Sequence, residues 1–305
     1  MIAIDLGSNT IRFLDYDCAS GAIQKVSETI VRTAEGMHET GMIGEAALER
    51  IVKAIKEAKN AMDFSGPVAA VCTAAFRNAS NREEALKRLE TAAGVRFKVI
   101  DPETEGYLTS LAVFQAANKV QPVKRLWMLD VGGASTEVAY TDGTKTVSQS
   151  FHLGIVTAAE KYKSSERMLS AYRKTFEEIR EFMADMRHTF KSPQMLAATA
   201  GTPTTMAAMK LGMTYKSYDR EKVNGTELTL TDMDKSYRKL LGSEKAVREE
   251  LVGVGREDLI MAGILLVKEI LAIGGFDRCT VFDDGLREGL AIAGCKELAG
   301  KGKKK

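Results

Sequence analysis

Two segments of this chain share one pattern, in which an apolar strand ends at an Asp and is followed by a turn of Gly and small polar residues. The first segment is Ile4-Asp5-Leu6-Gly7-Ser8-Asn9-Thr10, and the second is Leu129-Asp130-Val131-Gly132-Gly133-Ala134-Ser135-Thr136. After each turn an apolar run predicts a second strand, at 11–14 and 138–140. One such unit alone is also an ordinary hairpin. Two of them in one chain predict a duplicated domain.

The residue types in both turns suit a phosphate ligand. Glycines let the backbone approach an anion closely, and hydroxyl and amide side chains add donors. The acids at the strand ends, Asp5 and Asp130, are placed to hold a divalent cation, which prefers hard oxygen ligands. Organising the turns is the alternative role for both acids. We therefore expect a phosphate clamp between the two copies, with these contact residues: Gly7, Ser8, Asn9, Gly132, Gly133, Ala134, Ser135 and Thr136.

Length and charge restrict the function classes. A chain of 305 residues is long enough for two domains that each bury a core, and 45% hydrophobic with 28% charged residues is typical of a globular protein. The net charge of +2 argues against a general field for nucleic acid, so a basic site has to be local. No apolar run approaches the roughly 20 residues that span a bilayer. We expect no nucleic-acid or membrane partner.

The cysteines and the first residues predict a compartment. Cys18, Cys72, Cys279 and Cys295 form no C-x-x-C pair, so neither a zinc site nor a disulfide framework is indicated. The chain starts in a strand, without the basic and apolar regions of a signal peptide. A reducing cytoplasm is the predicted location.

Helices and strands alternate along the rest of the chain, which predicts an α/β fold. Helical spacing of apolar residues, or a cap and a stop residue, indicates helices at 45–62, 82–93 (capped by Asn81), from Pro102, 166–190, 260–273 and from 285. Short apolar runs indicate strands at 68–73, 95–100, 195–198 and 279–282. We predict two domains, each on a mixed five-stranded sheet, with a cleft between them. Their bounds are 1–120 with the returning helix 287–300, and 121–286, followed by a basic disordered tail at 301–305.

Five ordered motifs resemble a known family. They are 4–12, Thr73-Ala74-Ala75-Phe76-Arg77-Asn78-Ala79-Ser80-Asn81, 101–108, 130–137 and Asp283-Asp284-Gly285-Leu286-Arg287-Glu288-Gly289. Together they are similar to the exopolyphosphatase / guanosine pentaphosphate phosphohydrolase family, in its short two-domain form. The resemblance implies two duplicated ribonuclease H-like (actin-like ATPase) domains of the actin–hexokinase–chaperone superfold. It also implies hydrolysis of a terminal phosphoanhydride in inorganic polyphosphate or guanosine pentaphosphate, and favours a homodimer.

The resemblance assigns roles that agree with the chemistry. Glu105 aligns with the catalytic base, and a carboxylate can accept a proton from the attacking water without binding the anionic substrate. The alternative role of Glu105 is an acid that stabilises a helix N-terminus. Further phosphate contacts are implied for Arg12, Arg77, Gly201 and Thr202. An arginine can make bidentate contacts to phosphoryl oxygens. The alternative role of either arginine is a solvated charge at a strand end or a helix cap. The implied cofactor is Mg²⁺ or another divalent cation, with the ligands Asp130, Glu137 and Asp5.

Four positions depart from the family pattern. Ala134 stands where a third Gly is usual, and a Cβ is tolerable there if φ stays negative. Thr104 replaces the first of two adjacent acids, Pro203 removes an amide donor from the third Gly/Thr turn, and Asn224 occupies a position that is often His. The last two concern nucleotide preference more than hydrolysis.

Two rival functions use the same loops. A kinase of the superfold would transfer the terminal phosphoryl group of ATP to an acceptor, and the Glu105 motif argues against it. A sensor would bind polyphosphate or the guanosine nucleotide without hydrolysis. Orthophosphate release by water alone distinguishes the enzyme from both.

Overall fold

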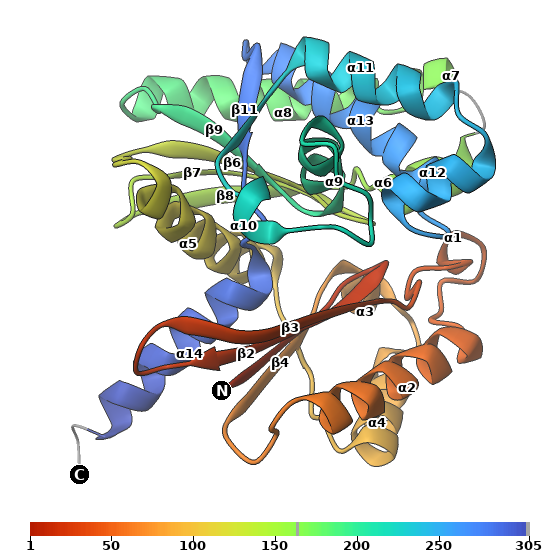
Figure 1. Cartoon of the computed structure of the whole chain (residues 1–305), viewed down its shortest axis with the longest axis vertical. Helices are drawn as coiled ribbons and strands as arrows, with labels where there is room; N and C mark the ends of the chain where they lie inside the picture. The colour runs from red at the N-terminus through yellow and green to blue at the C-terminus, as the bar shows by residue number, and fades with distance from the viewer. Residues whose placement is uncertain (163–164, 303–305) are drawn as a thin grey trace. The chain divides into compact units, whose positions relative to one another are not determined.

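The computed structural model describes residues 1–162 and 165–302. The chain divides into two compact units, Met1–Ala112 with Leu286–Lys305, and Val113–Gly285, and each is built on one mixed β-sheet (Figure 1). The disordered tail predicted at 301–305 is wrong for its first two residues, which belong to the last helix, and residues 303–305 lie outside the described part.

The first unit has a five-stranded sheet in the order β3-β2-β1-β4-β5. Strand β1 pairs antiparallel with β2 and parallel with β4. Its elements are β1 (Ile2–Leu6), β2 (Thr10–Asp17), β3 (Ala22–Ile30), α1 (Met37–Thr40), α2 (Glu45–Ala61), β4 (Val68–Cys72), α3 (Ala74–Asn78), α4 (Arg82–Ala93), β5 (Lys98–Val99), the first part of α5 (Pro102–Val120) and α14 (Leu286–Gly302).

Alternation along β1 determines which helix covers which face of this sheet. Ile2, Ile4 and Leu6 join a core with α2 and α4, whereas Ala3 packs with Ala291 of α14 on the opposite face (Figure 1). Because successive strand residues point to opposite faces, Asp5 shares the α14 face with Ala3.

The second unit has a six-stranded sheet in the order β10-β11-β9-β6-β7-β8. Its elements are the end of α5, β6 (Leu126–Val131), β7 (Thr136–Thr141), β8 (Thr146–Phe151), α6 (Ile155–Lys161), α7 (Ser165–Ala171), α8 (Arg173–Thr189), β9 (Met195–Thr199), α9 (Gly201–Lys210), α10 (Arg220–Val223), β10 (Thr226–Thr229), α11 (Leu230–Leu241), α12 (Lys245–Val252), α13 (Glu257–Ile273) and β11 (Arg278–Val281).

The two sheets repeat one topology. In each, the strand that ends near the Asp pairs antiparallel with the next strand and parallel with the strand after the following helices. The cores repeat as well, because Leu126 and Met128 of β6 pack on α5 much as Ala3 of β1 packs on α14. The predicted duplicated α/β fold is thus confirmed. The prediction of five strands in the second sheet is wrong, because β10 adds a sixth strand at the edge. The sequence gives no strand pattern there, since β10 is short and polar and only its Leu228 is buried.

Two predicted helix features differ from the structure. The helix expected at 166–190 is two helices, because Tyr172 leaves helical geometry (φ −93°, ψ 9°). Its ring meets Tyr162 edge-on, and the apolar stripe continues across the break, so periodicity does not reveal it. Asn81 does not cap α4 through its side chain; its amide instead accepts from the N–H and donates to the carbonyl of Ile43, at 2.9 and 3.0 Å.

The cysteine prediction needs a correction. Cys18 and Cys295 form a disulfide with their Cα atoms 5.3 Å apart, while Cys72 and Cys279 are free and buried. The partners lie 277 residues apart in sequence, and spacing along a chain does not report such proximity.

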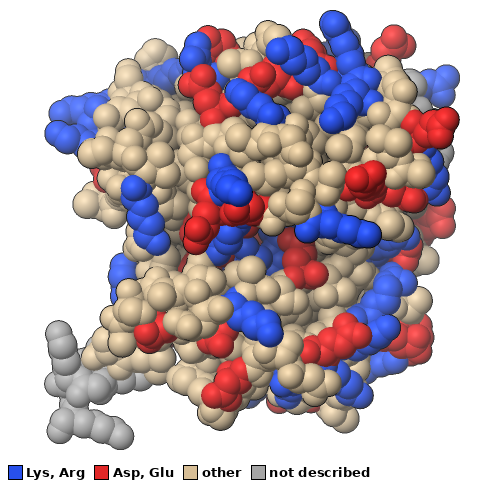
Figure 2. Space-filling model, viewed as in Figure 1, with Lys and Arg blue, Asp and Glu red and all other residues tan. Residues whose placement is uncertain are grey.

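Surface charge is mixed. On the face shown in Figure 2, basic and acidic side chains are interspersed and no large area of one sign is visible. Among the described helices, none combines the length and apolar character needed to cross a bilayer.

Helix α11 begins with a capping box whose acid, Asp232, should make the stability of the protein depend on pH. Thr229 and Asp232 exchange hydrogen bonds, and Lys210 donates to the Asp232 carboxylate at 2.8 Å. The ion pair with Lys210 holds the pKa of Asp232 at about 2, below its ordinary value of 3.8. A carboxyl whose pKa is lowered by folding stabilises the folded state above its unfolded pKa and loses this effect as the pH falls through the folded value.

Asp232→Asn should therefore lower the free energy of unfolding by about 1–2 kcal/mol at neutral pH. The difference from wild type should shrink between about pH 4 and pH 2, as urea titrations at several pH values would measure. Asp185→Asn, an exposed position on α8, is the control and should change little. An Asp232→Asn deficit that persists unchanged at pH 2 would contradict the assignment.

Candidate functional site

The first Asp-turn accepts backbone hydrogen bonds from the later segment 31–34. Gly7 donates to the carbonyl of Thr10 at 2.9 Å, which closes the turn between β1 and β2. The Asn9 carbonyl accepts from the N–H groups of Val31 and Arg32, both at 2.9 Å, and the Ser8 carbonyl accepts from Ala34. Backbone hydrogen bonds from residues 31–34 therefore support the turn.

The second Asp-turn has the same construction. Gly132 donates to the Ser135 carbonyl at 2.9 Å, as Gly7 does to Thr10. The first N–H groups of α6 then hold the turn, since Ile155 donates to the Gly132 carbonyl at 3.0 Å and Val156 donates to the Gly133 carbonyl at 2.8 Å. In the described chain, the N–H groups of Gly133 and Ala134 donate to no backbone carbonyl. Two such N–H groups are suited to an anion.

Ala134 and Thr136 have different structural roles in this turn. Ala134 keeps an ordinary backbone, because among the described non-glycine residues only Arg32 and Ala200 have positive φ. Its Cβ is therefore tolerated. Thr136 is fully buried, and its hydroxyl donates to the Leu153 carbonyl at 2.5 Å, so this hydroxyl fixes the turn.

Gly154 packs so closely against the second Asp-turn that no larger residue should fit there. A Cβ at this position would overlap the backbone of Gly133 and Ala134. Gly154→Ala should push the turn away from α6, lowering the free energy of unfolding by about 1–3 kcal/mol and weakening phosphate binding. Thermal melting and orthophosphate titration would measure both effects. Gly66→Ala, with open space around its Cβ, is the control. Unchanged stability and binding in Gly154→Ala would rule out this role of the close contact.

Asp130 and Glu137 are directly opposite each other in the β6–β7 ladder, so their side chains share one face of the sheet. Glu137 is buried and accepts a hydrogen bond from Ser150 at 2.7 Å. Two neighbouring carboxylates fit Mg²⁺, which usually takes one or two carboxylates and completes its shell with water and substrate phosphates. Among the described residues, no group of three or more His, Cys, Asp or Glu is close enough to hold a metal ion. This pair therefore suits a cation that the substrate helps to bind.

In the first unit the corresponding pair is Asp5 and Arg12, which are opposite each other in the β1–β2 ladder. The guanidinium of Arg12 forms an ion pair with Glu28 of β3, with Nε 2.8 Å from Oε2. Asp5 is buried at the end of its strand. The two copies thus differ, with two acids in the second and an acid facing a base in the first.

Glu105 and Arg77 meet within the first unit. The Glu105 Oε2 lies 2.6 Å from Nη1 of Arg77, and the two side chains are only 11% and 17% exposed. The same Nη1 donates to the Ile100 carbonyl at 3.0 Å, which ties Arg77 to the segment before α5. A charged pair with this little exposure is held in one geometry, so the Glu105 carboxylate is positioned before any substrate arrives.

The start of α5 fixes the position of Glu105. Asp101 caps the helix, because its carboxylate accepts from the Thr104 N–H at 2.7 Å, and this bond lowers the pKa of Asp101 below 3.8. Pro102 occupies the first helical position, where no intrahelical donor is needed. Glu105 is therefore on the first turn of a well-capped helix, whereas Glu103 is exposed.

The third Gly/Thr turn is the N-terminus of α9 in the second unit. Thr202 is fully buried, with its side chain against Gly263 of α13. Pro203 lies in the first turn of α9, where its missing N–H breaks no helical hydrogen bond. The Arg256 guanidinium approaches this turn and donates to the Gly201 carbonyl at 3.3 Å. Arg256 belongs to none of the sequence motifs, and its only sequence cue is a Gly-Arg-Glu-Asp run before an apolar helix.

Asn224 connects the last motif to α10. Its amide donates to the Asp284 carboxylate at 2.8 Å and accepts from the Asp283 N–H at 2.6 Å. Arg220 completes the cluster, with ion pairs to Asp283 and Asp284 at 3.4 and 3.2 Å. An amide offers both a donor and an acceptor, as a neutral His does, so Asn can replace His in holding this segment. Arg220 likewise lies outside every motif that the sequence shows.

The predicted site residues fall into groups by unit. The first unit brings together Glu105 with Arg77, and Asp5 with Arg12, beside the turn of Gly7, Ser8 and Asn9. The second unit holds the pair Asp130 and Glu137 beside the turn at 132–135, and separately Gly201 with Thr202 at α9.

Two mixed α/β units of one topology, each with an Asp-turn at the end of its first strand, define the actin–hexokinase–chaperone fold. Within this fold, the chain belongs to the Ppx/GppA phosphatase family, which residues 16–297 match.

Known proteins resemble the chain over nearly its whole length. Exopolyphosphatase 2 of Mycobacterium tuberculosis is 27% identical, over 95% of this chain and 97% of its own. A bifunctional 3-dehydroquinate synthase/phosphatase of Fusobacterium nucleatum is 22% identical over 96% of this chain. The match covers only 46% of that longer protein. The crystal structure of the Aquifex aeolicus Ppx/GppA family member superposes with a TM-score of 0.74 and 28% identity over 97% of each chain.

Proposed function

We propose that this protein hydrolyses the terminal phosphoanhydride of inorganic polyphosphate, with Glu105 as the general base and Mg²⁺ as the cofactor. The observation that carries the proposal is the Glu105 carboxylate, nearly buried, fixed by Arg77 and set on the first turn of a capped helix. A hydrolase needs such a preorganised acceptor for the proton of water, whereas a protein that only binds phosphate does not. The family and the exopolyphosphatase relative support the phosphoanhydride class.

The remaining residues have consistent roles in this reaction. The N–H groups of Gly133 and Ala134 suit the phosphoryl oxygens, where negative charge develops in the transition state. Asp130 and Glu137 would hold Mg²⁺, which neutralises charge on the transferring phosphoryl group. Guanosine pentaphosphate ends in the same anhydride and is the second substrate that we propose.

The test offers polyphosphate and guanosine pentaphosphate separately, with Mg²⁺ and without an acceptor, and measures orthophosphate release alongside binding. We expect release from at least polyphosphate. Binding without release would indicate a sensor, and ADP formation from ATP only when an acceptor is added would indicate a kinase.

Asp130→Asn tests the cation role. The Mg²⁺ concentration for half-maximal hydrolysis should rise roughly ten-fold or more, because one anionic ligand is lost. Chelation of Mg²⁺ by EDTA should abolish orthophosphate release in the wild type. Glu177→Gln, at an exposed position of α8, serves as the control. An unchanged Mg²⁺ dependence in Asp130→Asn would remove this residue from the cation site.

A further inference from the structure

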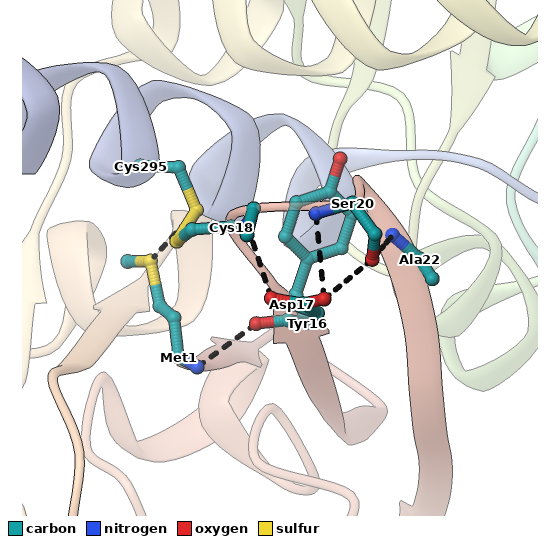
Figure 3. Close-up of a disulfide and its surroundings, with 8 residues drawn as sticks. Met1, Tyr16, Asp17, Cys18, Ser20, Ala22 and Cys295 are labelled. Atoms are coloured by element: carbon teal, nitrogen blue, oxygen red, sulfur yellow. Dashed lines mark hydrogen bonds between the residues drawn. A yellow bond between two sulfur atoms is a disulfide. The ribbon is translucent and has the colours of Figure 1, made fainter.

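A single covalent bond joins the N-terminal hairpin to the last helix. Figure 3 shows Cys18, in the turn between β2 and β3, bonded to Cys295 of α14, with the sulfur of Met1 beside them. The Met1 sulfur lies 3.7 Å from Cys295 Sγ, and the Met1 ammonium donates to the Tyr16 carbonyl at 2.9 Å. Chain segments 277 residues apart therefore meet at this bond.

The turn presents Cys18 in a fixed position at the surface. The Asp17 carboxylate accepts from the N–H groups of Ala19 and Ser20, at 3.0 and 3.3 Å, and Ser20 Oγ accepts from Ala22. Cys18 itself is exposed. A disulfide in which one cysteine is exposed on an ordered turn can be approached by a thiolate from solution.

Packing of α14 ends where the disulfide is attached. Side chains at 286–295 are buried or half-buried, whereas those at 296–299 are exposed. In the buried part, a Cβ at Gly289 would overlap the Leu108 carbonyl, and a Cβ at Gly294 would overlap the Met1 side chain. Among the α14 side chains that the structure describes, Cys295 is thus the last that is at least half-buried.

The same helix supports the segment that carries Glu105. Leu286 shares a small core with Ile100 and Leu108. The Ile100 carbonyl accepts from Arg77, and Leu108 lies one turn after Glu105 on α5. Movement of α14 would therefore remove packing from both ends of the segment that positions the base.

We propose that Cys18–Cys295 is a redox-cleavable latch that fastens α14 and, through Ile100 and Leu108, the Glu105 segment. A dithiol reductant would attack one sulfur and form a mixed disulfide. Its second thiol would then release the protein as two thiols, while the reductant becomes a disulfide, so that two electrons and two protons pass to the protein. Where glutathione and thioredoxin keep thiols reduced, a disulfide is usually transient, with a catalytic or redox-sensing role.

The other cysteines do not interfere with this exchange. Burial raises the pKa of the Cys72 and Cys279 thiols to about 12, so neither forms a thiolate at neutral pH. An alkylating reagent applied to the folded, reduced protein should therefore label Cys18 and Cys295 only.

Hydrogen exchange of the oxidised and dithiol-reduced full chain tests the latch. On reduction, amides at 290–299 should exchange at least roughly ten-fold faster, while those of α8 in the second unit stay unchanged, and Tm should fall by roughly 5–10 °C. Cys18→Ser, Cys295→Ser and the double variant should all match the reduced wild type under oxidising conditions, because each removes the same bond. Four free thiols in the oxidised protein, or equal exchange in both states, would overturn the proposal.

The link to the base rests on the proposed function and has a separate readout. Reduction should lower the rate of orthophosphate release, and reoxidation should restore it in the wild type and not in Cys18→Ser. Faster exchange at 290–299 with an unchanged rate would overturn the coupling to Glu105. No hydrolysis in either state would count against the proposed function, and the exchange measurement would still decide the latch.

Discussion

Glu105→Gln should lower turnover by roughly 10²–10⁴-fold, the usual contribution of a general base. Glutamine keeps the size of the side chain, and its amide oxygen can still accept the hydrogen bond from Arg77, which is 2.6 Å long in the wild type. It cannot accept a proton from water. Affinity for polyphosphate should stay the same or rise slightly, because repulsion between the carboxylate and the anionic substrate is lost. Steady-state kinetics with a separate binding titration would measure both quantities.

Glu103→Gln is the matched control for this variant. Glu103 is exposed, lies two residues earlier on α5 and therefore points to a different side of the helix. Its replacement should have a far milder effect. Equal turnover in wild type and Glu105→Gln would defeat the catalytic assignment.

Arg77→Ala should reduce kcat/KM by roughly 10–10³-fold, through both KM and kcat. As a phosphate ligand, the role that the sequence motif implies, Arg77 would affect KM. The structure adds contacts to Glu105 and to the Ile100 carbonyl, so the substitution also releases the base from its fixed position. Arg77→Lys should recover only part of the activity, since an ammonium lacks the planar fork of a guanidinium. Arg96→Ala, at an exposed position, is the control.

The double variant Arg77→Ala/Glu105→Gln separates the two roles of Arg77. If Arg77 positions the base, the double variant should lose little more kcat than Glu105→Gln alone. If Arg77 only binds substrate, the two losses should multiply. Fully multiplicative losses in kcat would contradict the positioning role.

The fold follows closely from local sequence patterns. Both Asp-turns predict strand pairs, and the ladders Asp5 to Arg12 and Asp130 to Glu137 have the same register. Alternation in β1 predicts two faces, and two helix layers cover them. The edge strand β10 escapes the sequence analysis because it is short and polar, and the break at Tyr172 escapes because hydrophobic periodicity reports a buried face and not the continuity of backbone hydrogen bonds.

The candidate site could be predicted from the sequence only in part, because some of its contacts form between segments that are far apart along the chain. Residues in the motifs are found by their type and order. The pairing of Arg77 with Glu105 and the contact of Arg256 with Gly201 join segments far apart in sequence, and no local pattern encodes them. The same applies to the support that α6 gives the second turn, since backbone hydrogen bonds from Ile155 and Val156 do not depend on side-chain identity.

Isotope labelling tests the central claim, that this protein is a phosphoanhydride hydrolase in which water is the nucleophile. Polyphosphate would be cleaved by the wild type with Mg²⁺ in ¹⁸O-labelled water, and the released orthophosphate analysed by mass spectrometry. We predict that each orthophosphate formed in a single turnover carries one oxygen from the solvent, and that Glu105→Gln forms the same product far more slowly. Absence of orthophosphate release while polyphosphate remains bound, or release of orthophosphate without solvent oxygen, would contradict the account.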